Sequence, residues 1–525
     1  METTLLTDKI VNFKLVQPGK VDDLVHLPMR VSFLLSFWLI LGLIYPSLAQ
    51  NNNLPDDFLS SDFHRGRRDA LRAKMPNNSV AVVFANPVRN RANDVNYVYH
   101  QDPNFYYLTG HREPHSALLV FTEEQRINGK RTDELIVVRG RANALTELYD
   151  GQHLGKERAQ SELGFAVAID GDAFANLPID FAQFDQVLFY DFQNDVRDTK
   201  EKDDLYDLIT QFKEKVGYPD EPSQTLMLEP EQNNLNTKTL DSLMQVMRAV
   251  KTDEELDVLR RAAVISALGH REVMKALRPG MSEREVQGMH EFIYKKYQAE
   301  YEGYPSIVGA GQNGSVLHYS ENYMPEIKDG ELVLMDVGAE YRGYTADITR
   351  TLPVNGKFTQ EQKIIYDLVY EAQKAGMEAC RAGATFQDIY HATALVINQG
   401  LVDLGIYQSL KREDIVDPTT GRNRYYPHGC CHHIGLDVHD MGGYDTLRTN
   451  MVITVEPGIY IPEGSPCDPK WWNIPVRIED NLIVTEDGYE VISDMVPSKS
   501  DEVEALMEED SFFNSADLPS LSGEE

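Results

Sequence analysis

Short apolar runs alternate with longer amphipathic stretches through the first half of the chain. Four apolar runs predict strands, at residues 79–84, 117–121, 135–138 and 187–190. Two stretches have the spacing of amphipathic helices, residues 65–74 and 201–216. Because strands alternate with helices, this half is expected to form an α/β domain. The aromatic stretch NFYYLTG at residues 104–110 is interpreted as core packing rather than as a ligand site.

The second half begins with helical patterns and continues with strands. Thr252 is expected to cap one long helix, and Ser282 another, the latter with Glu285 at the capping-box spacing. Amphipathic periodicity predicts three more helices, at residues 234–251, 358–382 and 385–404. The strand-rich segments that lie between and after these helices carry the candidate chemistry.

One of these segments, ELVLMDVGAEYRGYTADITRT at residues 331–351, reads as two strands joined by a turn near Arg342. Asp336 and Asp347 lie equally far from the centre of that turn. In a tight hairpin such residues face each other, with side chains about 5 Å apart. Two opposed carboxylates repel each other and are costly to desolvate, so a bound cation is the simplest remedy. The alternative is a hairpin whose aspartates face water.

Four further segments place acidic or imidazole groups in or beside apolar strands. They contribute one histidine from VLHYS, four from PHGCCHHIGLDVHD, one glutamate from TVEPG, and an arginine and a glutamate from VRIED: His318, His428, His432, His433, His439, Glu456, Arg477 and Glu479. Each alone has an ordinary structural explanation, such as a satisfied core histidine or a surface ion pair. Their concentration favours a divalent metal site. An oxygen-rich set without thiolates favours manganese, cobalt or zinc in a carboxylate-bridged pair.

Charge and composition narrow the function classes. The chain has 525 residues, enough for two or three domains, with 50 basic and 83 acidic side chains and a net charge of -33. This balance argues against nucleic acid or an anionic membrane as a partner. Four cysteines, Cys380, Cys430, Cys431 and Cys467, fit no zinc-ribbon or CxxC spacing, and we expect free, buried thiols.

The front of the chain carries an export signal. Arg30 precedes the apolar run VSFLLSFWLILGLIYPSLA, which ends in a small-x-small site at Ala49. Residues 1–49 therefore predict a signal-peptide region and a periplasmic or secreted protein that begins near Gln50, without stable membrane insertion after cleavage. Met29 is the more ordinary start of such a leader. The alternative is an uncleaved membrane anchor.

The motifs HYSEN, MDVGAEYRGYTADITRT, HGCCHHIGLDVHD, TVEPGIY and VRIEDN, in that order, resemble aminopeptidase P of the pita-bread metallopeptidase family, in its bacterial form. The resemblance extends over nearly the whole chain from about residue 55 to 508. It implies an α/β (α+β) protein with a smaller N-terminal α/β domain at residues 55–230 and a pita-bread catalytic domain at 231–505. We expect residues 506–525 to form an acidic, disordered tail.

The same resemblance assigns roles in the site. It implies two divalent ions, foremost Mn²⁺ with Co²⁺ or Zn²⁺ as alternatives, held by Asp336, Asp347, His432, Glu456 and Glu479. His318 and His428 would line the proline side of the cut, His439 would contact the scissile carbonyl, Glu456 would carry the proton, and Arg477 would lie beside a metal-binding glutamate. His433 and the pair Cys430-Cys431 depart from the family pattern.

The implied activity is removal of the N-terminal residue from peptides with proline in second position. A prolidase restricted to Xaa-Pro dipeptides is the main alternative, and a non-catalytic pita-bread binding protein is another. We also expect a homo-oligomer, a dimer or a tetramer.

Overall fold

The computed structural model describes residues 57–199, 201–219 and 234–515. The predicted leader, residues 1–49, lies outside the described residues. The chain from Leu59 onward forms one compact unit. Within the described ranges no helix combines the length and apolar character needed to cross a bilayer.

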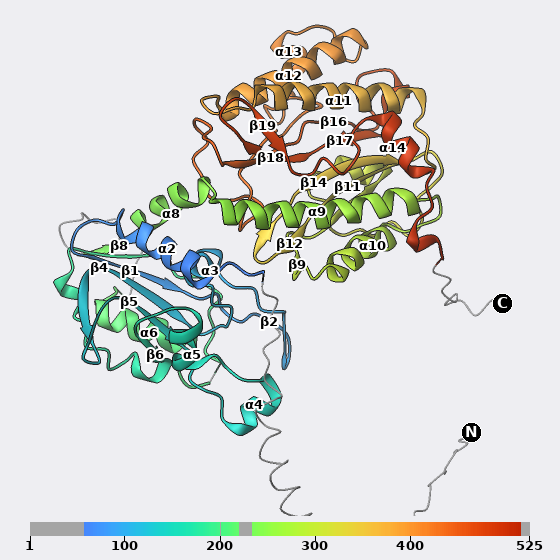
Figure 1. Ribbon diagram of the computed structural model, residues 1–525. Helices are drawn as coiled ribbons and strands as arrows, with labels where there is room; N and C mark the ends of the chain where they lie inside the picture. Colours follow the sequence, from blue (N-terminus) through green and yellow to red (C-terminus); the bar gives the residue numbers. More distant parts are fainter. Residues whose placement is uncertain (1–56, 200, 220–233, 516–525) are drawn as a thin grey trace, which may run out of the picture. The chain divides into compact units, whose positions relative to one another are not determined.

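The N-terminal half is built on a six-stranded sheet with the strand order β6-β5-β4-β1-β7-β8 (Figure 1). Its strands are β1 (Ser79–Phe84), β4 (Ala117–Ile127), β5 (Lys130–Val138), β6 (Ala168–Asp170), β7 (Gln186–Phe189) and β8 (Leu235–Asn236). A small hairpin, β2 (Asn90–Ala92) and β3 (Val95–Asn96), lies apart from the sheet. The helices are α2 (Ser61–Arg72), α3 (Pro103–Thr109), α4 (Ala144–Asp150), α5 (Gly155–Glu162), α6 (Leu205–Val216) and α8 (Thr239–Ala249).

Alternate residues of this sheet face two different cores. Ala81 and Val83 of β1 pack in the cluster that contains α2 and α3, whereas Val80 and Val82 pack with Leu208 and its neighbours in α6. This is the two-residue period of a strand buried on both faces. All four predicted strands are therefore confirmed. The predicted helix at 201–216 begins only at Leu205, because the Asp204 side chain accepts the Asp207 N–H as an N-cap.

The C-terminal half places short sheets between two pairs of helices (Figure 1). The helices are α9 (Asp253–Ala276), α10 (Glu283–Lys296), α11 (Gln360–Ala379), α12 (Phe386–Asp403), α13 (Arg412–Ile415) and α14 (Ser500–Met507). The strands are β9 (Tyr301–Glu302), β10 (Ile307–Ala310), β11 (Leu332–Val337), β12 (Ala339–Tyr341), β13 (Tyr344–Thr345), β14 (Ile348–Pro353), β15 (Val452–Val455), β16 (Gly458–Ile461), β17 (Ile474–Arg477), β18 (Asp480–Val484) and β19 (Tyr489–Val491).

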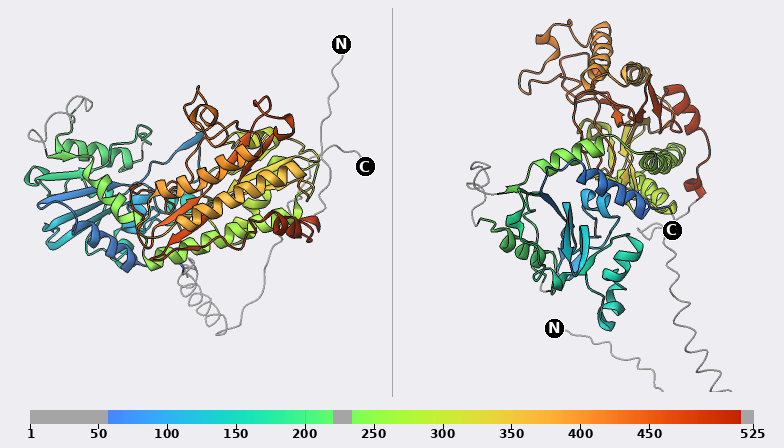
Figure 2. Two further views of the ribbon diagram at one scale, coloured as in Figure 1. Left: turned by 90° about the horizontal axis from the view of Figure 1, so that it is seen from above. Right: turned by 60° about the vertical axis from the view of Figure 1, so that its left-hand side comes forward.

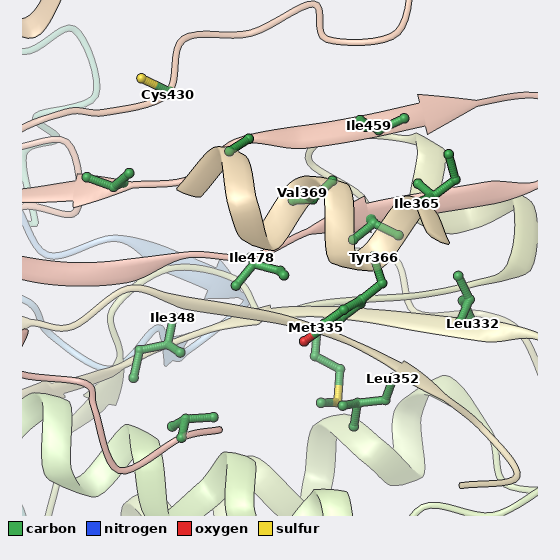
Figure 3. Packing of buried hydrophobic residues seen from close by; sticks show 14 of the residues in the cluster. Leu332, Met335, Ile348, Leu352, Ile365, Tyr366, Val369, Cys430, Ile459 and Ile478 are labelled. Carbon is green, nitrogen blue, oxygen red and sulfur yellow. The ribbon is translucent and has the colours of Figure 1, made fainter. Parts of the chain in front are cut away.

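Helices α9 and α10 cover one side of these strands, and α11 and α12, which run side by side in Figure 2, cover the other. Thr252 caps α9 in a capping box with Glu255, as predicted, and the Ser282 hydroxyl accepts the Glu285 N–H at the start of α10. Tyr366 of α11 reaches toward Met335 of β11 in the largest core cluster (Figure 3). This packing fixes the strands that carry the acidic groups.

The register of the central hairpin corrects the prediction that Asp336 and Asp347 face each other. Asp336 pairs with Thr349, so Asp347 is its diagonal neighbour on the same face. The turn consists of Arg342 and Gly343, with φ of +53° and +86°, as in a type I′ turn. Its centre therefore lies one residue later than the sequence suggested. The left-handed conformation of Arg342 is held by the Glu300 carboxylate, which accepts its backbone N–H over 2.9 Å and pairs with its guanidinium.

The prediction of a disordered tail from residue 506 is wrong for residues 506–515. Helix α14 extends to Met507, and Ser511 donates its hydroxyl to the backbone carbonyl of Glu272 over 3.1 Å. Phe512 stacks on Phe292 with ring centroids 5.8 Å apart. The apolar pair Phe512-Phe513 thus anchors the chain as far as Ser515, and residues 516–525 lie outside the described residues.

Arg248 of α8 connects the two halves of the chain. Its guanidinium pairs with Asp440 and Asp437 and donates to Oδ1 of Asn104 in α3 over 2.8 Å. Lys251 donates to the other oxygen of Asp440 over 2.8 Å. Arg248, Lys251 and Asp440 are each almost fully buried, so this network places the segment that follows His439.

Candidate metal centre

The acidic strands of the C-terminal half and the segment that follows Pro427 surround one cavity of about 360 Å³. Nine of its lining residues are the candidates named from the sequence: His318, Asp336, Asp347, His428, His432, His439, Glu456, Arg477 and Glu479. The structure therefore brings together every candidate site residue except His433.

The central hairpin contributes two carboxylates to this cavity. The Tyr304 hydroxyl contacts Oδ1 of both Asp336, at 2.7 Å, and Asp347. Asn481 of β18 holds the backbone of Asp347 from both sides: its Oδ1 accepts the Asp347 N–H over 2.9 Å, and its Nδ2 donates to the carbonyl over 2.6 Å. The two aspartates are thus fixed on one face although they are not directly opposed.

His432 presents one ring nitrogen to the carboxylates. Its Nδ1 lies 2.9 Å from the His433 carbonyl, and because a carbonyl only accepts, Nδ1 carries the proton. In the neutral ring Nε2 is therefore the free acceptor. It lies 3.5 Å from Asp347, 3.8 Å from Glu456 and 4.0 Å from Glu479.

Backbone pairing brings His432 and Glu456 together. The Thr454 N–H donates to the His432 carbonyl over 3.0 Å, and the Glu456 N–H donates to the Cys430 carbonyl over 2.8 Å. The histidine segment thus runs alongside β15 and its extension. Glu456 follows β15 directly, at the point where Pro457 and Gly458 turn the chain into β16.

Glu479 is the most deeply buried of the candidate ligands, with 1% of its surface exposed. Oε2 accepts the Thr349 hydroxyl over 2.7 Å, whereas Oε1 is buried and accepts no hydrogen bond from any residue that the structure describes. One atom from each of Asp347, His432 and Glu479 lies within 4.8 Å of the others. A buried carboxylate oxygen without a donor, beside a carboxylate and an imidazole, is the environment that a bound cation satisfies.

Arg477 holds the neighbouring groups in place. Its Nη2 donates to Oδ2 of Asp336, and its Nη1 donates to the Tyr460 hydroxyl over 2.8 Å. That hydroxyl also lies 2.9 Å from Nε2 of His428. Arg477 therefore links a candidate metal ligand to the histidine on the opposite wall.

The remaining histidines take separate positions. His439 and His318 are exposed on the rim of the cavity, and the His439 ring lies 4.4 Å from that of His432 at 83°. His433 is buried and turned away: its Nε2 lies 3.0 Å from the Gly443 carbonyl, and its ring packs on Phe386.

The acidic groups raise one another's affinity for protons. Burial, together with neighbouring carboxylates, raises the pKa of Asp336 to about 6, that of Glu456 to about 7 and that of Glu479 well above its usual range. Burial lowers the pKa of His432, but the hydrogen bond to Asp347 and the adjacent carboxylates outweigh it, so that this pKa rises to about 9. Positive charge is therefore favoured at this point, and a divalent cation would supply it.

Two tyrosines and a threonine of the site were missed from the sequence. Tyr460 and Thr349 lie inside motifs that were named from the sequence. A hydroxyl-bearing side chain within an apolar strand was the signal that could have identified them. Tyr304 lies in a loop before β10 that carries no such pattern. The four cysteines are free, as predicted, with Cys380 and Cys430 buried and Cys431 and Cys467 only partly so.

Comparison with known proteins agrees with this arrangement. Residues 257–486 match the model of metallopeptidase family M24, and residues 64–185 match that of the aminopeptidase P N-terminal domain. The chain is 35% identical to the Xaa-Pro aminopeptidase of Escherichia coli K12 over 462 residues, which cover 85% of this chain and 97% of that protein.

Solved structures give the same result for the fold. The structure of Pseudomonas aeruginosa aminopeptidase PepP matches with a TM-score of 0.76 at 34% identity, covering 86% of this chain and 98% of the other. Aminopeptidase P from E. coli with the inhibitor Pro-Leu matches with a TM-score of 0.74 at 32% identity and the same coverage. The chain thus has an N-terminal aminopeptidase P domain and a C-terminal pita-bread domain, and it belongs to the aminopeptidase P family of M24 metallopeptidases, which are metal-dependent exopeptidases.

Proposed function

We propose that this protein removes the N-terminal residue from peptides with proline in second position, using two divalent metal ions. Asp336, Asp347, His432, Glu456 and Glu479 would hold the ions. The observation that carries this proposal is the buried Oε1 of Glu479, which accepts no hydrogen bond within the described part of the chain and lies beside Asp347 and His432. The relatives named Xaa-Pro aminopeptidase support the substrate class.

The chemistry divides between the metals and the side chains around them. When bound, paired divalent ions lower the pKa of a water molecule and polarise a carbonyl group. The chain's own groups then handle substrate and protons. Glu456 would take the proton of the attacking water and return it to the leaving nitrogen. Exposed on the rim, His439 would donate a hydrogen bond to the carbonyl oxygen as negative charge develops there.

The proline side of the cut would be lined by His428 and His318. The Tyr460 hydroxyl lies within hydrogen-bond distance of the His428 ring, and Arg477 donates to that hydroxyl, so hydrogen bonds set the orientation of His428. Proline matters because its nitrogen carries no hydrogen once it forms a peptide bond. A site that demands an N–H at this position would reject it, and a wall of imidazole and aromatic side chains does not.

The proposal also covers the identity of the metal, the oligomeric state and the location of the protein. We take Mn²⁺ as the preferred ion, because the donor set is rich in oxygen. We expect a homo-oligomer, a dimer or a tetramer. We also propose that the protein is exported, to the periplasm or as a secreted protein. This part of the proposal rests on the sequence of residues 30–49.

The test combines metal removal with a substrate series. Chelation should abolish cleavage, and Mn²⁺ should restore it better than Zn²⁺ or Co²⁺. Ala-Pro-Pro and longer Xaa-Pro peptides should be cleaved in preference to Gly-Pro. Cleavage of Gly-Pro alone would favour the prolidase alternative, and full activity of protein shown by elemental analysis to be metal-free would refute the proposal.

A further inference from the structure

A second and larger hollow, of about 760 Å³, lies over α12, α13 and the segment 421–431. It differs from the metal cavity in its lining, which is aromatic and polar and includes Tyr390, Asn398, Asn423 and Tyr426. We call it the arginine groove, after Arg412 and Arg422 in its wall. Its volume lies in the range of pockets that enclose ligands larger than one amino acid.

The arginine groove adjoins the metal cavity. His428, Gly429, Cys431 and Tyr444 line both. A chain that enters the groove therefore passes His428 to reach the candidate metal ligands. A bound peptide could therefore occupy the groove while the bond to be cut lies near the candidate metal ligands.

The charge of the groove is opposite to that of the molecule. The chain carries 83 acidic and 50 basic side chains, yet none of the described residues that line the groove is acidic, and two are arginines. Both arginines are exposed. Neither forms an ion pair with a carboxylate among the described residues, so their charge is available to a ligand.

The loop that carries Arg422 is held by its own hydrogen bonds. Asp417 accepts the backbone N–H groups of Thr419 and Thr420 over 2.7 and 3.1 Å, and its own N–H donates to the Arg422 carbonyl over 2.8 Å. Arg422 donates to the Pro427 carbonyl over 3.0 Å, which fixes it beside His428. The position of this positive charge is therefore defined by the fold.

We propose that the arginine groove binds the substrate beyond the proline and selects a carboxylate there, on the second or third residue after the cut. This inference rests on the proposed function. An aminopeptidase substrate has a single residue on the amino side of the cut, so an open groove that adjoins the cavity fits the carboxyl side. The carboxylate can come from an acidic side chain or from the peptide terminus, and both meet Arg412 and Arg422 in the same way.

Four peptides separate these sources. Ala-Pro-Gly-Glu and Ala-Pro-Gly-Lys, both C-terminally amidated, compare side-chain charge, and Ala-Pro-Gly-Gly as free acid and as amide compares the terminus. The wild-type protein with its metal should show a kcat/KM about two- to fivefold higher for the acidic member of at least one pair, as expected for one exposed ion pair, and the difference should lie in KM. Added salt should reduce the ratio.

Arg412→Glu and Arg422→Gln should each bring the ratio toward one or below it. Lys411→Glu is the matched control, because it makes the same charge change next to Arg412 but outside the groove, and it should keep the wild-type ratio. A wild-type ratio of one in both pairs, or a ratio that neither arginine variant changes, would overturn the inference. If the wild-type protein cleaved no Xaa-Pro peptide at all, the proposed function itself would fall, so the two failures are distinguishable.

Discussion

Thr349 donates its hydroxyl hydrogen to Oε2 of Glu479 over 2.7 Å, which leaves Oε1 of the same buried carboxylate as the atom that faces Asp347 and His432. An unsatisfied buried carboxylate oxygen costs free energy that the fold must offset. The arrangement is explained if Thr349 orients the carboxylate and a cation completes it. In metal sites such outer hydrogen bonds set the direction of the ligand.

Replacing this ligand is expected to remove activity together with metal. Glu479→Gln keeps the shape of the side chain but loses the charge, and Asp347→Ala removes a second ligand. We expect kcat/KM to fall by more than about 100-fold, beyond the effect of losing only an outer partner. Bound metal, measured by elemental analysis, should fall in parallel, while the circular dichroism spectrum stays unchanged.

Thr349→Val provides the matched comparison. It should lower metal affinity by about 10–100-fold and leave activity at saturating metal largely intact, because the ligand remains but is less well oriented. Retention of full metal content by Glu479→Gln would contradict the assignment of Glu479.

His439 and His433 are expected to differ sharply. His439→Ala should lower turnover by about 10²-fold or more, comparable with removal of one oxyanion donor, and should spare metal content, because the ring lies on the rim. His433→Phe should keep most activity, because this ring packs on Phe386 away from the cavity. Loss of metal in His433→Phe combined with normal turnover in His439→Ala would reverse the two roles.

Asp440 should be important for stability rather than for chemistry. Asp440→Asn leaves the buried ammonium of Lys251 without its carboxylate and Arg248 with Asp437 as its remaining ion-pair partner, and we expect the free energy of unfolding to fall by about 3–5 kcal/mol. Asp437→Asn, at the half-exposed end of the same network, should cost much less. Urea unfolding of both variants tests this difference.

The pH dependence of the Asp440 effect has a defined sign. Burial raises the pKa of Asp440, but the charges of Arg248 and Lys251 outweigh it, so its folded pKa lies below the ordinary value of 3.8. The carboxylate therefore stabilises the fold fully above about pH 4 and progressively less as the pH falls through the folded pKa. The stability gap between wild type and Asp440→Asn should be constant near neutral pH and should close in acid.

The export proposal is tested on protein from the native host. N-terminal sequencing should show Gln50 as the first residue, because Arg30, the apolar run and the site ending at Ala49 have the sequence pattern of a cleavable leader. A soluble protein that still carries residues 1–30 would rule out this proposal.

How well the sequence predicts a structural feature of this protein depends on how far apart in the chain the interacting residues lie. Apolar runs predicted four of the six strands of the N-terminal sheet, as at Val80–Val83, whose side chains alternate between two cores. The short strand β6 was not predicted, and the helix predicted over residues 234–251 was wrong at its start, because Leu235–Asn236 form β8 and α8 begins only at Thr239. The capping signals at Thr252 and Ser282 are local, and they hold. The register of Asp336 and Asp347 was wrong, because it depends on a left-handed Arg342, which Glu300 stabilises from outside the hairpin.

Contacts between segments that lie far apart in the chain could not be predicted from the sequence. Nothing near Tyr304 indicates that its hydroxyl meets both aspartates, since the aspartates come from later strands. Phe512 is held in place by stacking on Phe292, which lies more than two hundred residues earlier in the chain. Composition alone predicted disorder at this position. The arginine groove likewise forms only when α12 and the loop after α13 pack together.

The buried network of Arg248, Lys251 and Asp440 makes the two halves of the chain depend on each other. A fragment that began at Thr252 would contain every candidate metal ligand, but it would leave the buried carboxylate of Asp440 with neither of its countercharges. Arg248 in turn depends on Asn104 in the first half of the chain. The catalytic half is therefore not an independent module: exchanging its N-terminal partner for that of a relative requires Asn104, Arg248, Lys251 and Asp440 to be transferred as one set.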